Sequence, residues 1–557
     1  MRLRAAEKLI TENSIEKADA VITQLTTLSL NREDSIRLNI LQIQLAIEVN
    51  DTERALHLTR NTLTQGRLSQ EQEIKILEYR AQARSIDGEF YAAARDRIYL
   101  TPLLKNKAKH INHENIWSLL QKVPMDQLKH YAAAPSMEEL NGWLELALLM
   151  QTNQADLDSQ LSALLAWQNS RPHHVAATTL PGELSLLAKI AQQKPKHIAL
   201  LLPLSGKLTP FGQAVRDGFL AAYYRAQQAG SDVPEISVID TKGKAEQTSL
   251  YEQATNIGAD LVIGPISKTA IRNLQKNAEL AVTTLSLNYG EPTSSSPNNL
   301  FQFGLAAEEE ARQAAQRARQ DGHKRAVIIS PDSAWGQRVQ KAFTQEWQTL
   351  GGTIASETNY KNDANYADMI SKLFSIDKSK QRARALRRLL GEKLEFTPRR
   401  RQDVDMVFLV AHPKQGRQIK PTLAFQYAGK LPVYATSHIF SGKQANSRDT
   451  DLNNIMFCDI PWLLESDSPI KNTIRDSWPT RSQTYNRFYA LGVDAFSLYP
   501  RLEQLSLFPN STIAGQTGYL SLDQQRRIHR QLTWAQIRNG KLVHLQGNTP
   551  NNEQEAL

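Results

Sequence analysis

The sequence predicts an α + α/β protein, in which an N-terminal helical array precedes two α/β lobes. Two observations predict this class. Residues 1–190 carry apolar side chains at helical spacing with almost no alternating β-branched run, whereas residues 197–557 alternate short apolar strands with helices. The chain of 557 residues is 41 % hydrophobic, which allows several packed cores. No apolar run approaches the roughly 20 residues needed to cross a bilayer, which excludes a transmembrane protein.

A repeat organises the first 190 residues. Helix openings with an acidic residue followed by a small one place Ala18, Ala55 and Ala92 at intervals of 37 residues. Small residues at such a period are typical of stacked helix pairs, because one pair cannot bury its apolar face alone. The segment resembles a tetratricopeptide-like array, although the full consensus is absent. A non-repeating helical bundle is the alternative for this domain, which we place with its linker at residues 1–190.

Strand, loop and helix alternate in two series after a boundary at residues 171–196. The expected strands are 197–202, 235–240, 260–264 and 281–286 in the first series, and 325–330, 405–410 and 431–435 in the second. Near-continuous apolar strands that alternate with helices indicate parallel sheets covered on both faces. We expect two lobes within residues 197–557, with ligand loops at the carboxyl ends of the strands. Lobe 1 is expected at about 197–302 and 464–515, and lobe 2 at about 303–463 and 516–545.

Motifs for catalysis are missing from the sequence. It contains no phosphate-binding loop, no dinucleotide fingerprint, no H-E-x-x-H, and no G-x-S-x-G around Ser205. The single cysteine, Cys458, excludes a disulfide framework and a multi-thiolate zinc site, and its apolar neighbours predict a buried strand residue. The histidines at 110, 113, 173 and 174 are interpreted as solvated. We therefore expect no enzyme activity, no metal and no cofactor.

Small polar or aromatic residues follow many of the expected strands. In a two-lobed protein these residues would face a cleft between the lobes, where hydroxyls and helix N-terminal amides can bind a carboxylate or a sugar. The alternative is that they cap helices or end strands. The candidate ligand-binding residues are Ser205, Ser267, Ser286, Asn288, Trp335, His412 and Ser437.

The motifs around these residues resemble those of type I periplasmic solute-binding proteins of the branched-chain amino acid class. The resemblance lies in residues 198–206 with 211–218, in Gly264-Pro-Ile-Ser267, in Leu285-Ser-Leu-Asn288, and in Asp332-Ser-Ala-Trp-Gly336, with Ala411-His412 and Thr436-Ser437 at further contact positions. It implies a type I periplasmic-binding-protein fold. Trp335 would then lie where that family places an aromatic ring over the ligand.

The whole chain resembles the outer-membrane lipoprotein activators of a class A penicillin-binding protein. The resemblance lies in the helical domain ahead of the α/β fold and in specific C-terminal motifs at 457–464, 491–496, 515–523 and 526–530. The resemblance implies a non-catalytic regulator that binds this peptidoglycan synthase and stimulates its transpeptidase activity, with peptidoglycan as a further partner. It also implies a location on the periplasmic side of the outer membrane.

The anchor that this resemblance implies is not in the sequence. The family's signal peptide and lipid-bearing cysteine are missing here, so we expect either a trimmed chain or a cytosolic protein. The alternative function is a periplasmic solute receptor for an amino acid or a cell-wall fragment. A hydrolase is a third reading, which the missing nucleophile–base set disfavours.

Positive charge is concentrated in one segment. The net charge is +9, and residues 378–401 carry ten Lys and Arg against Glu392 and Glu395. This concentration points away from a general polyanion surface, so we expect no nucleic-acid partner. Leucines at helical spacing predict a basic amphipathic helix, followed by Arg399, Arg400 and Arg401. We expect these arginines to meet an acidic face of the synthase or anionic wall polymer, and a solvated surface helix is the alternative.

Overall fold

Two compact units make up the protein. The computed structural model describes residues 2–545 except 13, 65–67, 135–136, 155, 242–247, 292–295, 362–363, 392–394, 444–446, 466 and 509–510. The first unit comprises Met1–Gln193 with Asn510–Thr512, and the second comprises Lys194–Pro509 with Ile513–Gly547. None of the described helices is long and apolar enough to cross a membrane.

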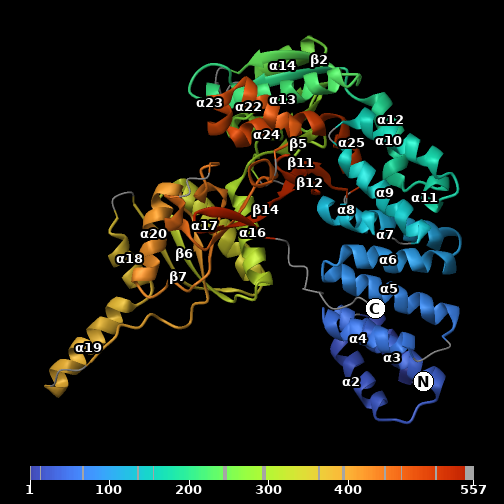
Figure 1. Ribbon diagram of the computed structural model, residues 1–557, viewed down its shortest axis with the longest axis horizontal. Helices are drawn as coiled ribbons and strands as arrows, with labels where there is room; N and C mark the ends of the chain where they lie inside the picture. The colour runs from blue at the N-terminus through green and yellow to red at the C-terminus, as the bar shows by residue number, and fades with distance from the viewer. Residues whose placement is uncertain are drawn as a thin grey trace. The chain divides into compact units, whose positions relative to one another are not determined.

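The first unit is an array of helices joined by short turns (Figure 1). Leucine, isoleucine and alanine side chains on the facing sides of successive helices form its cores. The helices are α1 (Arg2–Thr11), α2 (Ile15–Thr26), α3 (Arg32–Glu48), α4 (Thr52–Thr64), α5 (Gln70–Ile86), α6 (Phe90–Leu100), η1 (Thr101–Leu103), α7 (Asn106–Leu120), α8 (Met125–Ala133), α9 (Glu138–Thr152), α10 (Leu157–Ser170), α11 (Val175–Thr178) and α12 (Gly182–Gln193).

The same turn joins the two helices of the first three pairs. One backbone N–H closes each turn on the carbonyl five residues earlier, at 2.8 Å in all three cases: Ser14 to Leu9, Asp51 to Ala46, and Glu89 to Arg84. Asn50 and Gly88 precede two of these donors and have positive φ, a conformation that favours glycine and asparagine. The turns recur after 37 and 38 residues, so the repeat expected from the sequence is present.

Small residues lie where the second helix of each pair is buried, but one of them differs from the expected residue. Ala18 and Ala55 are fully buried, four residues after their turn donors. The matching position in the third pair is Ala93, which is fully buried, and Ala92 is only half-buried. The second interval is longer by one residue, so the expected spacing of 37 selects the wrong alanine.

The first sheet of the second unit has eight strands in the order β11-β12-β13-β5-β4-β3-β1-β2. The strands from β13 to β2 run parallel, and the β11–β12 and β12–β13 pairs are antiparallel. Their bounds are β1 (His197–Leu202), β2 (Glu235–Asp240), β3 (Leu261–Ile263), β4 (Thr283–Ser286), β5 (Leu300–Phe303), β11 (Ile513–Gly515), β12 (Gly518–Leu522) and β13 (Arg527–Gln531).

The second sheet has seven strands in the order β15-β14-β10-β9-β8-β6-β7. The strands from β10 to β7 run parallel, and β14 and β15 are antiparallel additions. Their bounds are β6 (Arg325–Pro331), β7 (Thr353–Tyr360), β8 (Met406–Leu409), β9 (Val433–Ala435), β10 (Ile455–Asp459), β14 (Thr533–Arg538) and β15 (Lys541–Leu545). Cys458 is a fully buried residue of β10, as expected.

The C-terminal segment divides between the two sheets differently from the expectation. We expected residues 516–545 in the second lobe, but β12 and β13 belong to the first sheet because β13 pairs with β5. Only β14 and β15 join the second sheet. The chain therefore crosses between the sheets three times: between β5 and α16, after β10, and at Leu532 between β13 and β14.

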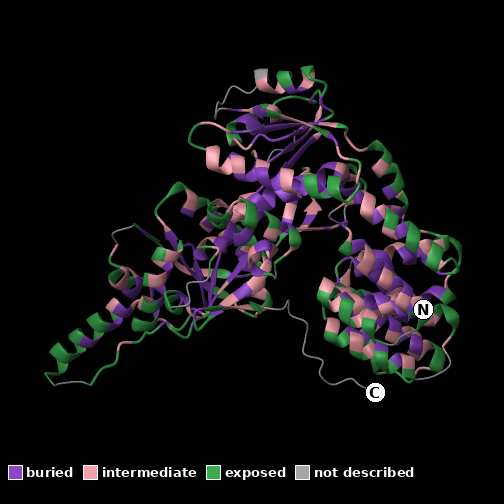
Figure 2. Ribbon diagram, turned by 45° about the horizontal axis from the view of Figure 1, so that its top comes forward, coloured by how far each residue is buried: buried purple, intermediate pink, exposed green. Residues whose placement is uncertain are grey.

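Helices cover both sheets, with buried residues concentrated in the strands between them (Figure 2). In the first lobe, α13 and α24 cross at Gly218 and Gly492, where an added Cβ would lie 2.2 Å or less from a backbone oxygen of the other helix. The helices are α13 (Thr209–Gln228), α14 (Thr248–Asn256), α15 (Lys268–Gln275), α16 (Ala307–Gln320), α17 (Ala334–Thr349), α18 (Tyr366–Leu373), α19 (Ile376–Leu390), α20 (Pro413–Phe425), η2 (Ser437–Ile439), η3 (Asp449–Leu452), α21 (Pro461–Leu464), α22 (Pro469–Ser477), α23 (Pro479–Thr484), α24 (Asn486–Leu498), η4 (Tyr499–Arg501) and α25 (Leu502–Leu507).

Replacing a buried repeat alanine tests the packing of the array. Ala55→Leu should lower the free energy of unfolding of the first unit by about 1–3 kcal/mol, because the larger side chain has no space at the helix crossing. Arg54→Leu, at the exposed neighbouring position, should change it by less than about 0.5 kcal/mol. Urea unfolding of both variants measures the difference, and equal stabilities would contradict close packing at Ala55.

Candidate functional site

The strand ends of the first sheet carry four of the candidate ligand residues, and two of them are engaged within the fold. The Ser286 hydroxyl is fully buried and donates to the carbonyls of Asn288 and Phe301 at 2.9 and 3.2 Å. Asn288 donates its amide to the Ile266 carbonyl at 3.1 Å. Asn288 therefore joins the loops after β3 and β4, and Ser286 joins the end of β4 to β5. Ser205 and Ser267, which are half-buried in the loops after β1 and β3, remain candidates for contact with a ligand.

The strand ends of the second sheet bring three rings together. Trp335 lies in the first turn of α17, and His412 is the N-cap residue of α20. Their rings stack with centroids 5.0 Å apart. His438, in η2 after β9, lies 4.9 Å from the Trp335 ring and 5.9 Å from the His412 ring. The sequence analysis selected Trp335 and His412 but missed His438. The signal that could have identified His438 is its position directly after Ser437, which was selected.

Ser437 serves the fold rather than presenting a free hydroxyl. Its backbone N–H and its hydroxyl donate to the two carboxylate oxygens of Glu310 at 3.0 and 3.1 Å. The His438 ring lies 3.6 Å from the same carboxylate. Burial opposes ionisation of Glu310, but the hydrogen bond and charge of His438 together with Arg530 and Arg487 outweigh it, and the pKa of Glu310 is lowered. An ionised carboxylate therefore lies behind the ring cluster.

Side chains of α16 bind the segment in which the chain passes from β13 to β14. The Arg530 backbone N–H donates to Glu309 at 2.8 Å, and its fully buried guanidinium lies 3.3 Å from Glu309 and 3.8 Å from Glu310. Gln313 donates its amide to the Arg530 carbonyl and accepts the Leu532 N–H, at 2.6 and 2.9 Å. Since α16 itself begins just after the β5 crossing, one helix joins two of the three crossings.

The crossing after β10 contains a second buried ion pair. Asp459 is fully buried, and its carboxylate accepts hydrogen bonds from Arg487 of α24. Arg487 also donates to the carbonyls of Ser437 and Phe440, at 3.1 and 3.3 Å. The guanidinium of a first-lobe helix thus holds the loop that carries His438 in the second lobe.

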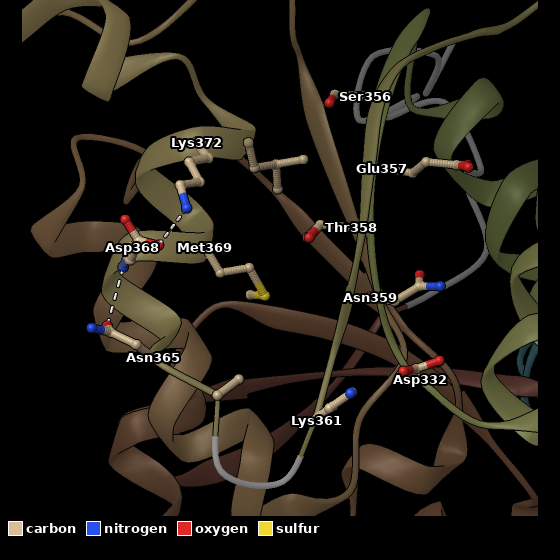
Figure 3. Close-up of a pocket in the computed structure, with 12 residues that line it drawn as sticks. Asp332, Ser356, Glu357, Thr358, Asn359, Lys361, Asn365, Asp368, Met369 and Lys372 are labelled. Carbon is tan, nitrogen blue, oxygen red and sulfur yellow. Dashed lines mark hydrogen bonds and ion pairs between the residues drawn. The ribbon is translucent and has the colours of Figure 1, made fainter. Parts of the chain in front are cut away.

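A cavity of about 590 Å³ lies on the second lobe between the edge strand β7 and α18 (Figure 3). Ser356 and Thr358 point from β7 toward α18, and Met369 points from α18 toward the strand. The Asp368–Lys372 ion pair, 2.8 Å long, lies on its α18 side. The lining carries charges of both signs and few apolar side chains, so it selects no class of ligand. None of the seven candidate ligand residues lines it.

Two of the four histidines expected to be solvated, His113 and His174, are buried, whereas His110 and His173 are exposed. His113 lies in α7, not in a loop, and its ring packs edge-on against Trp143. Burial, with the charges of Lys109, His110 and His174, lowers the pKa of His113 to about 4. His174 is also buried, and it lines a cavity of about 650 Å³ in which Arg171 pairs with Glu145 at 2.7 Å.

The three candidate partner-binding arginines differ in their surroundings. Arg401 forms a two-pronged pair with Asp403, at 2.6 and 2.7 Å, and donates to the Ala355 carbonyl at 3.1 Å. This hydrogen bonding lowers the pKa of Asp403 to about 2. The Arg400 side chain donates to backbone carbonyls, the nearer one at 2.8 Å. Only the Arg399 side chain is exposed, while its backbone N–H donates to the Ser379 hydroxyl.

Within the described residues, no group of three or more His, Cys, Asp and Glu side chains could hold a metal ion. The lone thiol of Cys458 is fully buried, and burial raises its pKa well above the ordinary value. This thiol is therefore unsuited to nucleophilic chemistry.

The fold and the strand-end residues define a class: a helical repeat domain followed by a two-lobed module of the periplasmic-binding-protein type. The chain belongs to the family described as "LppC putative lipoprotein", which matches residues 1–540. A relative from Photobacterium profundum is 30 % identical over 95 % of this chain and 86 % of its own length. A relative from Vibrio cholerae is 29 % identical over 96 % of this chain and 88 % of its own length. Both are named penicillin-binding protein activator LpoA.

Solved structures show the same architecture. Haemophilus influenzae LpoA has a TM-score of 0.58 and 26 % identity, covering 98 % of this chain and 94 % of its own. The C-domain of that protein, described as a regulator of PBP1A, covers 63 % of this chain and 99 % of its own, with a TM-score of 0.50. The match therefore includes the helical unit as well as the α/β unit.

His529 gives the crossing region a pH dependence. Its ring bonds Asp523 at 2.9 Å and Glu309 at 3.0 Å, and these bonds raise the pKa of His529 to about 9. In an unfolded chain the pKa is about 6.5. The stabilisation is therefore complete below about pH 6.5 and is lost as the pH rises through about 9. His529→Gln should lower the melting temperature more at pH 6 than at pH 9.5, as measured by circular dichroism. An equal loss at both pH values would contradict a charged His529.

Proposed function

We propose that this chain is a non-catalytic regulator of peptidoglycan synthesis that binds a class A penicillin-binding protein and stimulates its transpeptidase activity. One observation carries the proposal. Relatives named penicillin-binding protein activators match more than nine-tenths of the chain, across both units. The buried, high-pKa thiol of Cys458 and the internally bonded hydroxyls of Ser286 and Ser437 support a role without chemistry of its own.

An activator of this kind works through differential binding. It raises the activity of the synthase only if it binds the active conformation more tightly than the inactive one. A tenfold preference for the active state corresponds to about 1.4 kcal/mol of coupling free energy. Stacked helix pairs supply a semi-rigid arm, and the two-lobed unit supplies the docking surface for the synthase.

The proposed location is the periplasmic side of the outer membrane. The family description as a lipoprotein supports a lipid anchor at the N-terminus of the natural protein. An anchored chain would meet peptidoglycan on its way to the synthase, which makes the wall polymer a further proposed partner.

A second candidate function is a solute receptor that binds an amino acid or a cell-wall fragment. The observation that favours it is the cluster of Trp335, His412 and His438 at the carboxyl ends of the second sheet. Stacked rings at strand ends suit the apolar face of a sugar or an amino-acid side chain. Both functions are compatible if a ligand at this cluster biases the regulator.

Cross-linking by a purified class A penicillin-binding protein on lipid-linked precursor tests the regulator. Added at micromolar concentration, the full chain should raise the cross-linked fraction several-fold, and the chain alone should produce no cross-links. The measurement is chromatography of the digested product. A synthase that neither binds the chain nor changes its cross-linking would reject the proposal.

Ligand screening by thermal shift tests the receptor. Amino acids and wall fragments that bind should raise the melting temperature of the wild-type chain, by an amount that grows with the logarithm of ligand concentration above the Kd. Trp335→Ala should abolish the shift, because the variant loses the central ring of the cluster. Phe425→Ala, at an exposed ring elsewhere in the lobe, is the matched control. A shift that persists unchanged in the Trp335 variant would place the ligand elsewhere.

A further inference from the structure

The outer half of α19 is an exposed helix with an apolar face. The first half is held by the second lobe, where Ile376, Ser379 and Ala383 are buried. From residue 384 to 390 every side chain is exposed. The helix projects away from the sheet (Figure 1), and its outer part is coloured as exposed in Figure 2. The fold therefore supports this segment only at its base.

Three leucines lie on this outer half. Leu386, Leu389 and Leu390 are 48 %, 82 % and 52 % exposed. At 3.6 residues per turn they fall within an arc of about 100°, on the side that continues the buried positions of the first half. The apolar stripe of α19 thus begins inside the lobe and ends in solvent.

Local signals explain why a helix forms without packing. Its outer residues are Arg, Ala and Leu, all strong helix formers. Asp377 lies in the first turn and Arg388 in the last, where each charge favours the helix dipole. Gly391 ends the helix with a positive φ of 66°, and its N–H donates to the Arg387 carbonyl. These signals favour a helical conformation even while the leucines are exposed to solvent.

The exposed large hydrophobic side chains of the second lobe are confined to short segments, and one of these segments includes the outer half of α19. Among the described residues of 304–463, the large hydrophobic side chains classed as exposed belong to two short segments, 386–396 and 425–427. The second segment lies at the end of α20, where Gln426 donates to the Ala367 carbonyl of α18. The first segment includes Leu386, Leu389 and Leu390 on the outer half of α19, and exposed apolar side chains grouped on one helix in this way are typical of an interaction surface.

The charges around the leucines define the partner. Residues 378–390 contain six Lys and Arg and no acidic residue. Arg382 lies within the apolar arc and Arg387 flanks it, whereas Arg384 and Arg388 lie on the opposite side of the helix. A complementary surface therefore has an apolar groove for the leucines and acidic groups at its rim. The Arg400 and Arg401 side chains bond within the lobe, so the helix carries more of this positive surface than they do.

We propose that the outer half of α19 is a docking helix that inserts Leu386, Leu389 and Leu390 into an acid-rimmed apolar groove on the activated penicillin-binding protein. The inference rests on the proposed function and adds the contact surface and the chemistry of the partner. Anchors at i, i+3 and i+4 are the pattern of a helix bound in a protein groove. A lipid surface fits less well, because membrane binding scales with apolar area and this helix offers two turns.

Binding of the full chain to a purified class A penicillin-binding protein from the same organism tests the docking helix. Leu386→Ser/Leu389→Ser should raise the Kd by about 30-fold or more, since central apolar anchors dominate such interfaces. Leu28→Ser/Leu165→Ser, a matched pair of exposed leucines in the first unit, should leave the Kd within about twofold. Circular dichroism spectra of both double variants that match the wild-type spectrum would show that the fold is retained.

A charge variant provides a second readout. Arg382→Glu/Arg387→Glu should slow association by about tenfold at low salt, and the difference should shrink as salt screens the charges. Lys17→Glu/Arg54→Glu in the first unit is the control with the same charge change. An association rate at low salt equal to that of the wild-type chain would contradict the proposed acidic groups at the rim of the groove.

The outcomes separate the two proposals. A wild-type chain that binds no synthase would overturn the proposed function and this inference with it. Wild-type binding that survives Leu386→Ser/Leu389→Ser would overturn the docking helix alone. Co-sedimentation with phosphatidylglycerol-containing vesicles provides the third comparison. If the leucine variant alone fails to sediment with the vesicles but still binds the synthase, the leucines contact a lipid surface, and the proposed protein groove is overturned.

Discussion

The buried guanidinium of Arg530 is the charge around which the second unit is built. It is fully buried at the crossing from β13 to β14, and removing one partner of such a buried pair leaves an uncompensated charge. Glu309 and Glu310 of α16 supply its counter-charges at 3.3 and 3.8 Å. Because α16 follows one crossing and Arg530 lies at another, this buried ion-pair cluster links two of the segments in which the chain passes between the two sheets.

The same charge cluster supports the ring cluster at the strand ends. Glu310 accepts hydrogen bonds from Ser437 and lies 3.6 Å from His438, which contacts the Trp335 ring. Arg487 of α24 holds the Ser437 carbonyl from the first lobe. The residues that face outward at the strand ends are thus positioned by groups buried behind them. Preorganisation of this kind keeps side chains in place before a ligand or a partner arrives.

The sequence predicts elements better than it predicts the partners of side chains. Apolar runs located β1, β6 and β8 to within one residue at either end, because buried parallel strands leave a strong pattern. Hydroxyls leave no such pattern. Ser286 and Ser437 look like ligand contacts in sequence, and only the fold reveals the carbonyls and the carboxylate that they bond. Burial of His113 and the pairing of β13 with β5 likewise depend on contacts between residues far apart in sequence.

The recurring turn of the helical array has a consequence for its evolution. Each turn is closed by a backbone bond, and two of the turns place Asn50 and Gly88 at positive φ before the donor. Neighbouring pairs contact one another mainly along the array, as in other solenoids. Duplication or deletion of one 37- or 38-residue module would therefore preserve every remaining turn. Selection could lengthen or shorten the array in whole modules while the α/β unit stayed unaltered.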